Sequence, residues 1–122
     1  MDTALLGEVS RCATRITREY AYPAALDELY ALGIVKLGSL VLRIADLLLT
    51  VPVTTVTAGD LRILFVEATS LACALEAAKV EEMHARDLRG LCARLAAMGR
   101  SVEADAAEDL ARVRAALDRR TG

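Results

Sequence analysis

The sequence has few of the residues that build turns, aromatic cores or disulfide frameworks. Its 122 residues include no tryptophan, one phenylalanine, three tyrosines, two prolines and three cysteines. Apolar residues nevertheless make up 55% of the chain, and most of them are alanine or aliphatic. Alanine and leucine favour helices, and few turn-forming residues interrupt them here. The composition therefore predicts an all-α protein of about one domain in length.

Cysteine and basic charge are both scarce. Cys12, Cys73 and Cys92 are odd in number and far apart in the sequence, so we expect reduced thiols in an intracellular compartment. The net charge is −2, whereas a nucleic-acid-binding protein usually has an excess of basic residues. The charge therefore does not predict direct binding of DNA or RNA.

Uninterrupted apolar runs are too short to cross a membrane. The most apolar stretch, residues 29–56, contains Lys36, Arg43 and Asp46, and a spanning helix needs about 20 predominantly apolar residues. The mean hydropathy of +0.37 is still high for a small domain. Such a domain has little interior in which to bury apolar surface. We therefore expect no membrane insertion and a partner that covers part of the surface.

Apolar spacing predicts a short helix at about residues 4–13, an extended link at 14–17 and a long helix at about 23–49. The long helix is apolar around most of its circumference, which is typical of a helix buried on more than one side. It is therefore the predicted dimer core. The interface residues expected there are Leu29, Ile34, Leu37, Leu40, Val41, Ile44 and Leu48.

The second half of the chain also has helical spacing. An extended, Thr- and Val-rich loop is expected at 50–57, and the Thr-x-x-Asp at 57–60 predicts a capping box at the start of the next helix. Residues 61–98 form either one long helix or two helices with a break near 79–85. Gly99 is a predicted helix end, and Ser101 is the predicted cap of a last helix.

The order of these elements resembles the histone fold over about residues 4–72. "RIT" (15–17) is similar to the first loop of that family, and "TVTAGDLRIL" (55–64) is similar to its second loop and third-helix start. The resemblance implies a helix–loop–long helix–loop–helix domain at 1–72, followed by a C-terminal helical extension at 73–122. It also implies a histone-fold partner chain, identical or different, paired across the long helix.

The same resemblance implies a non-catalytic dimerisation subunit of a chromatin, transcription or kinetochore-type assembly, nuclear in a eukaryote and otherwise cytoplasmic. Histone-like DNA phosphate contacts would come from Arg15 and Arg18, with Arg11 nearby. The alternative is that these arginines lie on a solvated surface and form local ion pairs with Glu8 and Glu19. This alternative is favoured because three arginines without surrounding lysines would release few counterions from DNA. We expect DNA to be bound weakly or only through a partner.

Metal-binding and catalytic patterns are weak. Glu81-x-x-His84 has the spacing used in di-iron bundles, but the chain has one histidine, so only a homodimer completes such a site. Cys73, His84 and Cys92 lack the spacing of a zinc site, and the glycines form no phosphate-binding loop. We expect no catalytic residue, metal or cofactor. The alternative function is a four-helix-bundle oligomeric scaffold, including one with metal at a dimer interface.

Overall fold

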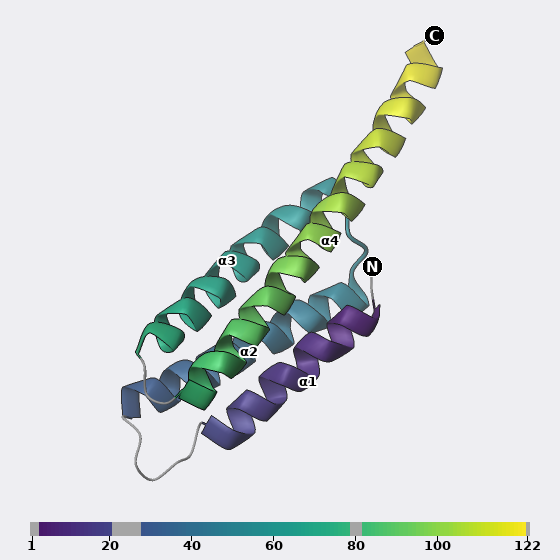
Figure 1. Ribbon diagram of the computed structural model, residues 1–122. Coiled ribbons are helices and arrows are strands. Elements are labelled where there is room, and N and C mark those ends of the chain that lie inside the picture. Colours follow the sequence, from purple (N-terminus) through teal and green to yellow (C-terminus); the bar gives the residue numbers. More distant parts are fainter. Residues whose placement is uncertain (1–2, 21–27, 79–81, 122) are drawn as a thin grey trace.

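Four helices make up almost all of the computed structural model, which describes residues 3–20, 28–78 and 82–121. They are α1 (Thr3–Tyr20), α2 (Glu28–Thr50), α3 (Thr55–Ala77) and α4 (Glu82–Thr121). Each helix packs against two others in the cyclic order α1, α2, α3, α4, and successive helices run in opposite directions (Figure 1). The prediction of an all-α chain is confirmed, and its arrangement is an antiparallel four-helix bundle.

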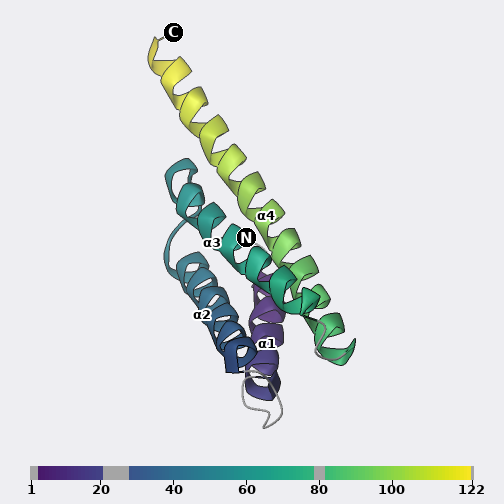
Figure 2. The ribbon, with the colours of Figure 1, turned by 90° about the vertical axis from the view of Figure 1, so that its left-hand side faces the viewer.

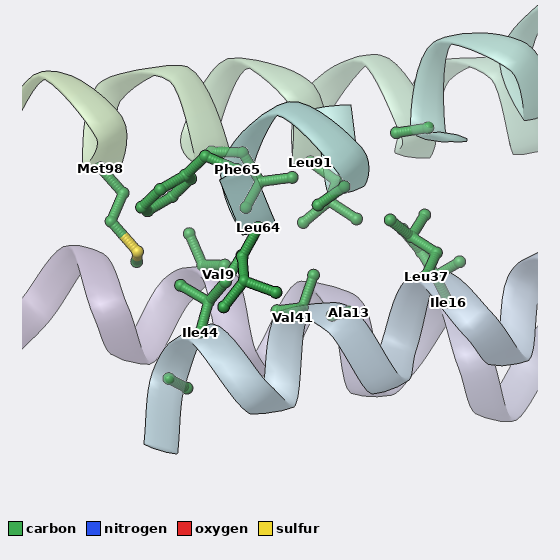
Figure 3. Close-up of a cluster of buried hydrophobic side chains, with 14 of the residues drawn as sticks. Val9, Ala13, Ile16, Leu37, Val41, Ile44, Leu64, Phe65, Leu91 and Met98 are labelled. Carbon is green, nitrogen blue, oxygen red and sulfur yellow. The ribbon is translucent and has the colours of Figure 1, made fainter. Parts of the chain in front are cut away.

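One continuous apolar core joins the four helices. Figure 3 shows side chains of α1, α2, α3 and α4 meeting between the helices. The large side chains with less than 2% exposure come from α1, α2 and α4: Val9, Ile16, Ile34, Leu37, Val41, Ile44, Leu88, Leu91, Leu95, Met98 and Val102. The core side of α3 is built from Leu61, Leu64, Phe65 and Leu75 with three fully buried alanines. The C-terminal segment is therefore part of the same core.

Helix α1 is longer than predicted and includes the segment that was expected to be an extended link. Residues 14–17 are helical, and Ile16 and Tyr20 continue the buried face of the helix. The hydroxyl of Thr17 donates a hydrogen bond to the carbonyl of Ala13, so this β-branched residue fits within the helix. Burial of an apolar face outweighs the weak strand preference of the segment.

The connection between α2 and α3 is shorter than predicted. Only residues 51–54 separate the two helices, and α3 begins at Thr55. The cap is Thr54, whose hydroxyl accepts from the Thr57 N–H at 3.1 Å, while the Thr54 N–H donates to the Thr57 hydroxyl at 2.8 Å. A capping box is therefore present, but Thr54 is its N-cap residue. Thr57, the predicted N-cap, is instead the third residue of α3. The predicted start of α2 at Pro23 lies outside the described residues.

Helix α4 runs without interruption through the predicted boundary at Gly99 and Ser101. Met98 and Val102 are both fully buried, and the helix continues because this buried face crosses the glycine. The alternative of two helices within 61–98 is confirmed, since α3 ends at Ala77 and α4 begins at Glu82. The last part of α4 projects beyond the other three helices (Figure 2).

The finer histone-like plan is not confirmed. The segment that resembles the first histone loop is helical, and α2 and α3 have the same length of 23 residues. A long central helix between two short ones is therefore not seen in the described residues. Helix α3 also continues through position 72, where the predicted histone-like domain ends.

Close contact between α1 and α2 depends on Gly38. A Cβ atom at this position would clash with the Thr17 hydroxyl oxygen, which is itself held by its bond to Ala13. A threonine in a helix has few alternative rotamers, so it cannot easily move away. The absent side chain of Gly38 thus lets the two helices approach. Gly99 differs, because nothing lies within 4 Å of a Cβ built there.

We expect Gly38→Ala to lower the free energy of unfolding by about 1–3 kcal/mol, as overpacked cores do. Gly99→Ala is the matched control and should raise it by about 0.5–1 kcal/mol, because alanine is the better helix former. Urea denaturation followed by circular dichroism measures both. In a Thr17→Ala background most of the Gly38→Ala penalty should disappear. A penalty that persists there would contradict this role for Gly38.

Candidate functional site

The outward side of α2 carries a row of exposed apolar side chains, which we call the α2 outer face. Its members and their exposed fractions are Leu29 (75%), Leu32 (60%), Val35 (42%), Leu42 (58%) and Leu49 (71%). Together with Ser39 and Asp46, the positions from 32 to 49 recur at alternating steps of three and four residues. This is the spacing with which one helix packs along another. An exposed apolar row of this kind marks an interaction surface.

The predicted interface residues on α2 divide between its two sides. Ile34, Leu37, Val41 and Ile44 have at most 1% exposure and form part of the chain's own core. Leu40 and Leu48 are partly buried and pack against that core. Leu29 alone among the seven belongs to the α2 outer face. Six of the seven predicted interface residues thus pack within the chain itself, and α2 keeps a second apolar side.

Two grooves border the α2 outer face. One lies between α1 and α2, has a volume of about 490 Å³, and is lined by Thr14, Arg18, Val35 and Leu42 among others. The other, of about 400 Å³, lies between α2 and α3 and includes Leu29 and Leu32. The outer face therefore forms a ridge between two grooves, a shape into which a second helix can pack.

A polar cluster lies between α1 and α4, where the core meets solvent. The Asp87 carboxylate accepts hydrogen bonds from the Arg15 guanidinium at 3.1 Å and from the Tyr20 hydroxyl. The Arg15 contact holds the pKa of Asp87 below its usual value. Burial, together with the bond to Asp87, raises the pKa of Tyr20 to about 12. The carboxylate is thus kept ionised and the phenol neutral, which ties α1 to α4.

His84 extends this cluster to α2. It is buried, and its ring lies 3.7 Å from the Tyr20 ring between centroids. Its Nδ1 lies 3.3 Å from the Tyr30 hydroxyl, so the imidazole bridges α1 and α2. Glu81, its partner in the predicted di-iron spacing, is outside the described residues. Within the described ranges, no group of three or more His, Cys, Asp or Glu side chains could hold a metal ion.

The three arginines considered for DNA contact lie in two different grooves. Arg11 and Arg15 line a groove between α1 and α4 together with Arg86 and Arg94, while Arg18 lines the groove between α1 and α2. Arg15 is already paired with Asp87 at 3.1 Å and Glu19 at 3.7 Å. The local pair with Glu19 is thus present, as the solvated alternative required. The spacing of four and three residues still places all three on the outward side of α1, but Arg15 is already engaged by two carboxylates.

Comparisons with known proteins return no relative for this chain. No protein-family model, no curated protein and no solved structure matches it. None of the helices in the described part is long and apolar enough to cross a membrane. Function is therefore inferred from the residues and their arrangement.

The polar cluster predicts a specific pH dependence of stability. Because the pKa of Asp87 is lowered in the folded protein, its contribution is complete above about pH 4, the ordinary value for aspartate, and is lost as the pH falls through the folded value. Asp87→Asn should lower the free energy of unfolding at pH 7 by about 1–3 kcal/mol. The difference in free energy of unfolding between the wild type and Asp87→Asn should become smaller below about pH 4. Asp118→Asn, on the projecting end of α4, is the control, and a gap that is equal at both pH values would contradict the assignment.

The small number of arginines, of which Arg15 is already paired with Asp87 and Glu19, also predicts weak DNA binding. We expect the isolated protein to bind duplex DNA with a Kd of about 10⁻⁵ M or weaker at about 0.15 M salt, in the range of non-specific binding. Fluorescence anisotropy across a salt series measures this. Tight binding that is lost in an Arg15→Ala/Arg18→Ala variant would instead support the histone-like DNA contacts.

Proposed function

We propose that this protein is a non-catalytic helical scaffold that pairs with a second copy of itself through the α2 outer face. The observation that carries the proposal is the exposed apolar row on one side of α2. Burying one leucine side chain is worth about 1.5–3 kcal/mol. Five apolar side chains from each copy therefore supply a substantial driving force for pairing, from which the cost of association is subtracted.

When the α2 helices of two copies pack in antiparallel orientation, the α2 outer face of one copy can pack against the same face of the other. When Leu32 of one copy lies opposite Leu49 of the other, Leu42 lies opposite Ser39 near the two-fold axis, where the small serine leaves room for the leucine. The two-fold symmetry repeats each contact, as in most homodimers. Leu32 and Leu49 then close both ends of a contact that spans residues 32–49, which is about 26 Å of the helix. Leu29 lies beyond that contact.

One pair of opposite charges agrees with this register: Lys36 lies on the border of the α2 outer face, and Asp46 lies within the row, opposite Val35 of the other copy. Lys36 and Asp46 are both exposed, and the antiparallel register brings Lys36 of one copy beside Asp46 of the other, twice per dimer. A parallel pairing would instead place each of these residues beside its own equivalent, which is a like-charge contact. The two Lys36–Asp46 pairs favour a second copy as the occupant, whereas the exposed Arg43, within two residues of Lys36 of the other copy in this register, opposes it.

The histone-fold hypothesis stays a prediction supported by the resemblance of "RIT" and "TVTAGDLRIL". A subunit of a chromatin, transcription or kinetochore-type assembly would also need a partner chain. The bundle scaffold is preferred because it requires only the exposed face described above and no histone-like geometry.

We expect the wild type to be a dimer in sedimentation equilibrium. Leu42→Glu should weaken its dimerisation by about 100-fold, because it places two charges at the centre of the contact. Leu117→Glu is the matched control, since Leu117 is a similarly exposed leucine at the projecting end of α4. Circular dichroism should show unchanged helix content in both variants. A monomeric wild type, or a Leu42→Glu variant that dimerises normally, would contradict the proposal.

Charge reversal tests the direction of pairing. Lys36→Glu and Asp46→Lys should each weaken the dimer, because each creates two like-charge contacts. The double variant should recover most of the lost affinity, because the opposite charges meet again with their positions exchanged. If the double variant is weaker than either single one, the antiparallel register is wrong.

A further inference from the structure

The outer border between α3 and α4 is held in a fixed antiparallel register by ion pairs. Arg62 donates to the Glu103 carboxylate, with Nη2 at 2.8 Å from Oε2, and Arg89 Nη1 lies 3.2 Å from Glu76 Oε1. Along two antiparallel helices, each step forward on one helix is matched by a step back on the other. Pairs in one register therefore have the same sum of residue numbers, and these two pairs do. The two pairs are separated by 14 residues on α3, which is about four turns.

Two cysteines occupy the same register between these ion pairs. Cys73 on α3 lies three residues before Glu76, and Cys92 on α4 lies three residues after Arg89. Their sulfur atoms are 4.0 Å apart. Residues that are far apart in the sequence are thus brought into contact by helix packing.

We propose that Cys73 and Cys92 are a modification site: a thiol pair that a small-molecule disulfide, such as glutathione disulfide, oxidises to an internal disulfide bond. A disulfide has an S–S distance of about 2.05 Å, so the sulfur atoms must approach by about 2 Å. Rotations of the two side chains supply this movement while the packed contact between α3 and α4 keeps the helices in place. The proposal concerns α3 and α4 and is independent of the pairing through α2.

The surroundings of the two sulfurs set the order of the reaction. Cys73 is exposed and open to the oxidant, whereas Cys92 is half-buried. Burial, with Cys73 and Glu76 nearby, raises the pKa of Cys92 to about 12, so it is a thiol at neutral pH. Cys73 is therefore the residue that reacts first, since the thiolate is the attacking species and access decides which thiol is reached.

The two steps conserve atoms and electrons. The Cys73 thiolate attacks one sulfur of glutathione disulfide, a Cys73–glutathione bond forms, and one glutathione thiolate leaves. Cys92 then gives its proton to solvent and attacks the Cys73 sulfur, which releases the second glutathione thiolate. The protein thiols lose two electrons, and glutathione disulfide gains them. Because Cys92 must lose a proton, the second step should become faster as the pH rises.

The bond would tie α3 to α4 across the chain segment that connects them. A crosslink of this kind stabilises the folded state mainly by restricting the unfolded chain. We therefore expect oxidation to raise the melting temperature by several degrees while leaving the α2 outer face unchanged. Formation of the Cys73–Cys92 disulfide and dimerisation through α2 can thus be measured separately.

The full-length protein is equilibrated with glutathione disulfide, alkylated and digested with trypsin. Cleavage after arginine and lysine places the three cysteines in separate peptides, 12–15, 63–79 and 90–94. We expect the wild type to lose the mass of two hydrogen atoms and to give peptide 63–79 linked to 90–94. Cys12→Ser is the matched control and should behave like the wild type. Cys92→Ser should stop at the mixed disulfide of Cys73 with glutathione, and Cys73→Ser should leave Cys92 unmodified.

Two results would overturn the proposal. One is a wild type that accumulates glutathione adducts or crosslinks between chains without an internal 63–79/90–94 link. The other is an internal link that lowers the melting temperature, which would mean that the bond does not fit the native packing of α3 on α4. Dimerisation of the oxidised protein is read separately, so a monomer in both states would count against the α2 interface alone.

Discussion

Helix α2 is apolar on two opposite sides, and a ring of four helices can cover only one of them. Ile34, Leu37, Val41 and Ile44 fill the centre of the bundle, where side chains of α1, α3 and α4 meet them (Figure 3). The other side of α2 remains exposed between two grooves. The rest of the structure depends on this division, because the first side holds the fold together and the second supplies the proposed contact between copies.

Polar groups fix how the helices align around that core. Apolar contacts are not directional, so they leave the register of neighbouring helices only loosely determined. Arg15 and Tyr20 on one helix meet Asp87 on another, and His84 connects this cluster to Tyr30. At the other end of the bundle, Asp109 accepts hydrogen bonds from the backbone N–H and the hydroxyl of Thr55, so α4 helps to cap α3. These contacts lie at both ends of the bundle, which limits sliding of α4.

The contact between α3 and α4 combines the tightest register with the two neighbouring thiols. Ala68 and Ala72 on the core side of α3 are fully buried. The packing of α3 against α4 also brings side chains on the outer border of the two helices into contact. The 4.0 Å separation of Cys73 and Cys92 is a consequence of this packing. The same packing that half-buries Cys92 also keeps it next to Cys73.

The sequence by itself determined the helical class and the apolar faces of the helices, and it left open whether residues 61–98 form one helix or two. Apolar residues at helical spacing carry that information locally, and Leu61, Leu64 and Phe65 are buried as their spacing predicted. Local preference failed at residues 14–17 and at Gly99, because burial of Ile16 and Val102 outweighs it. Only the tertiary structure decided which side of α2 faces the core, which groove receives each arginine and which thiols meet. Periodicity marks the faces of a helix, but the neighbour that covers each face is chosen by contacts between residues distant in the sequence.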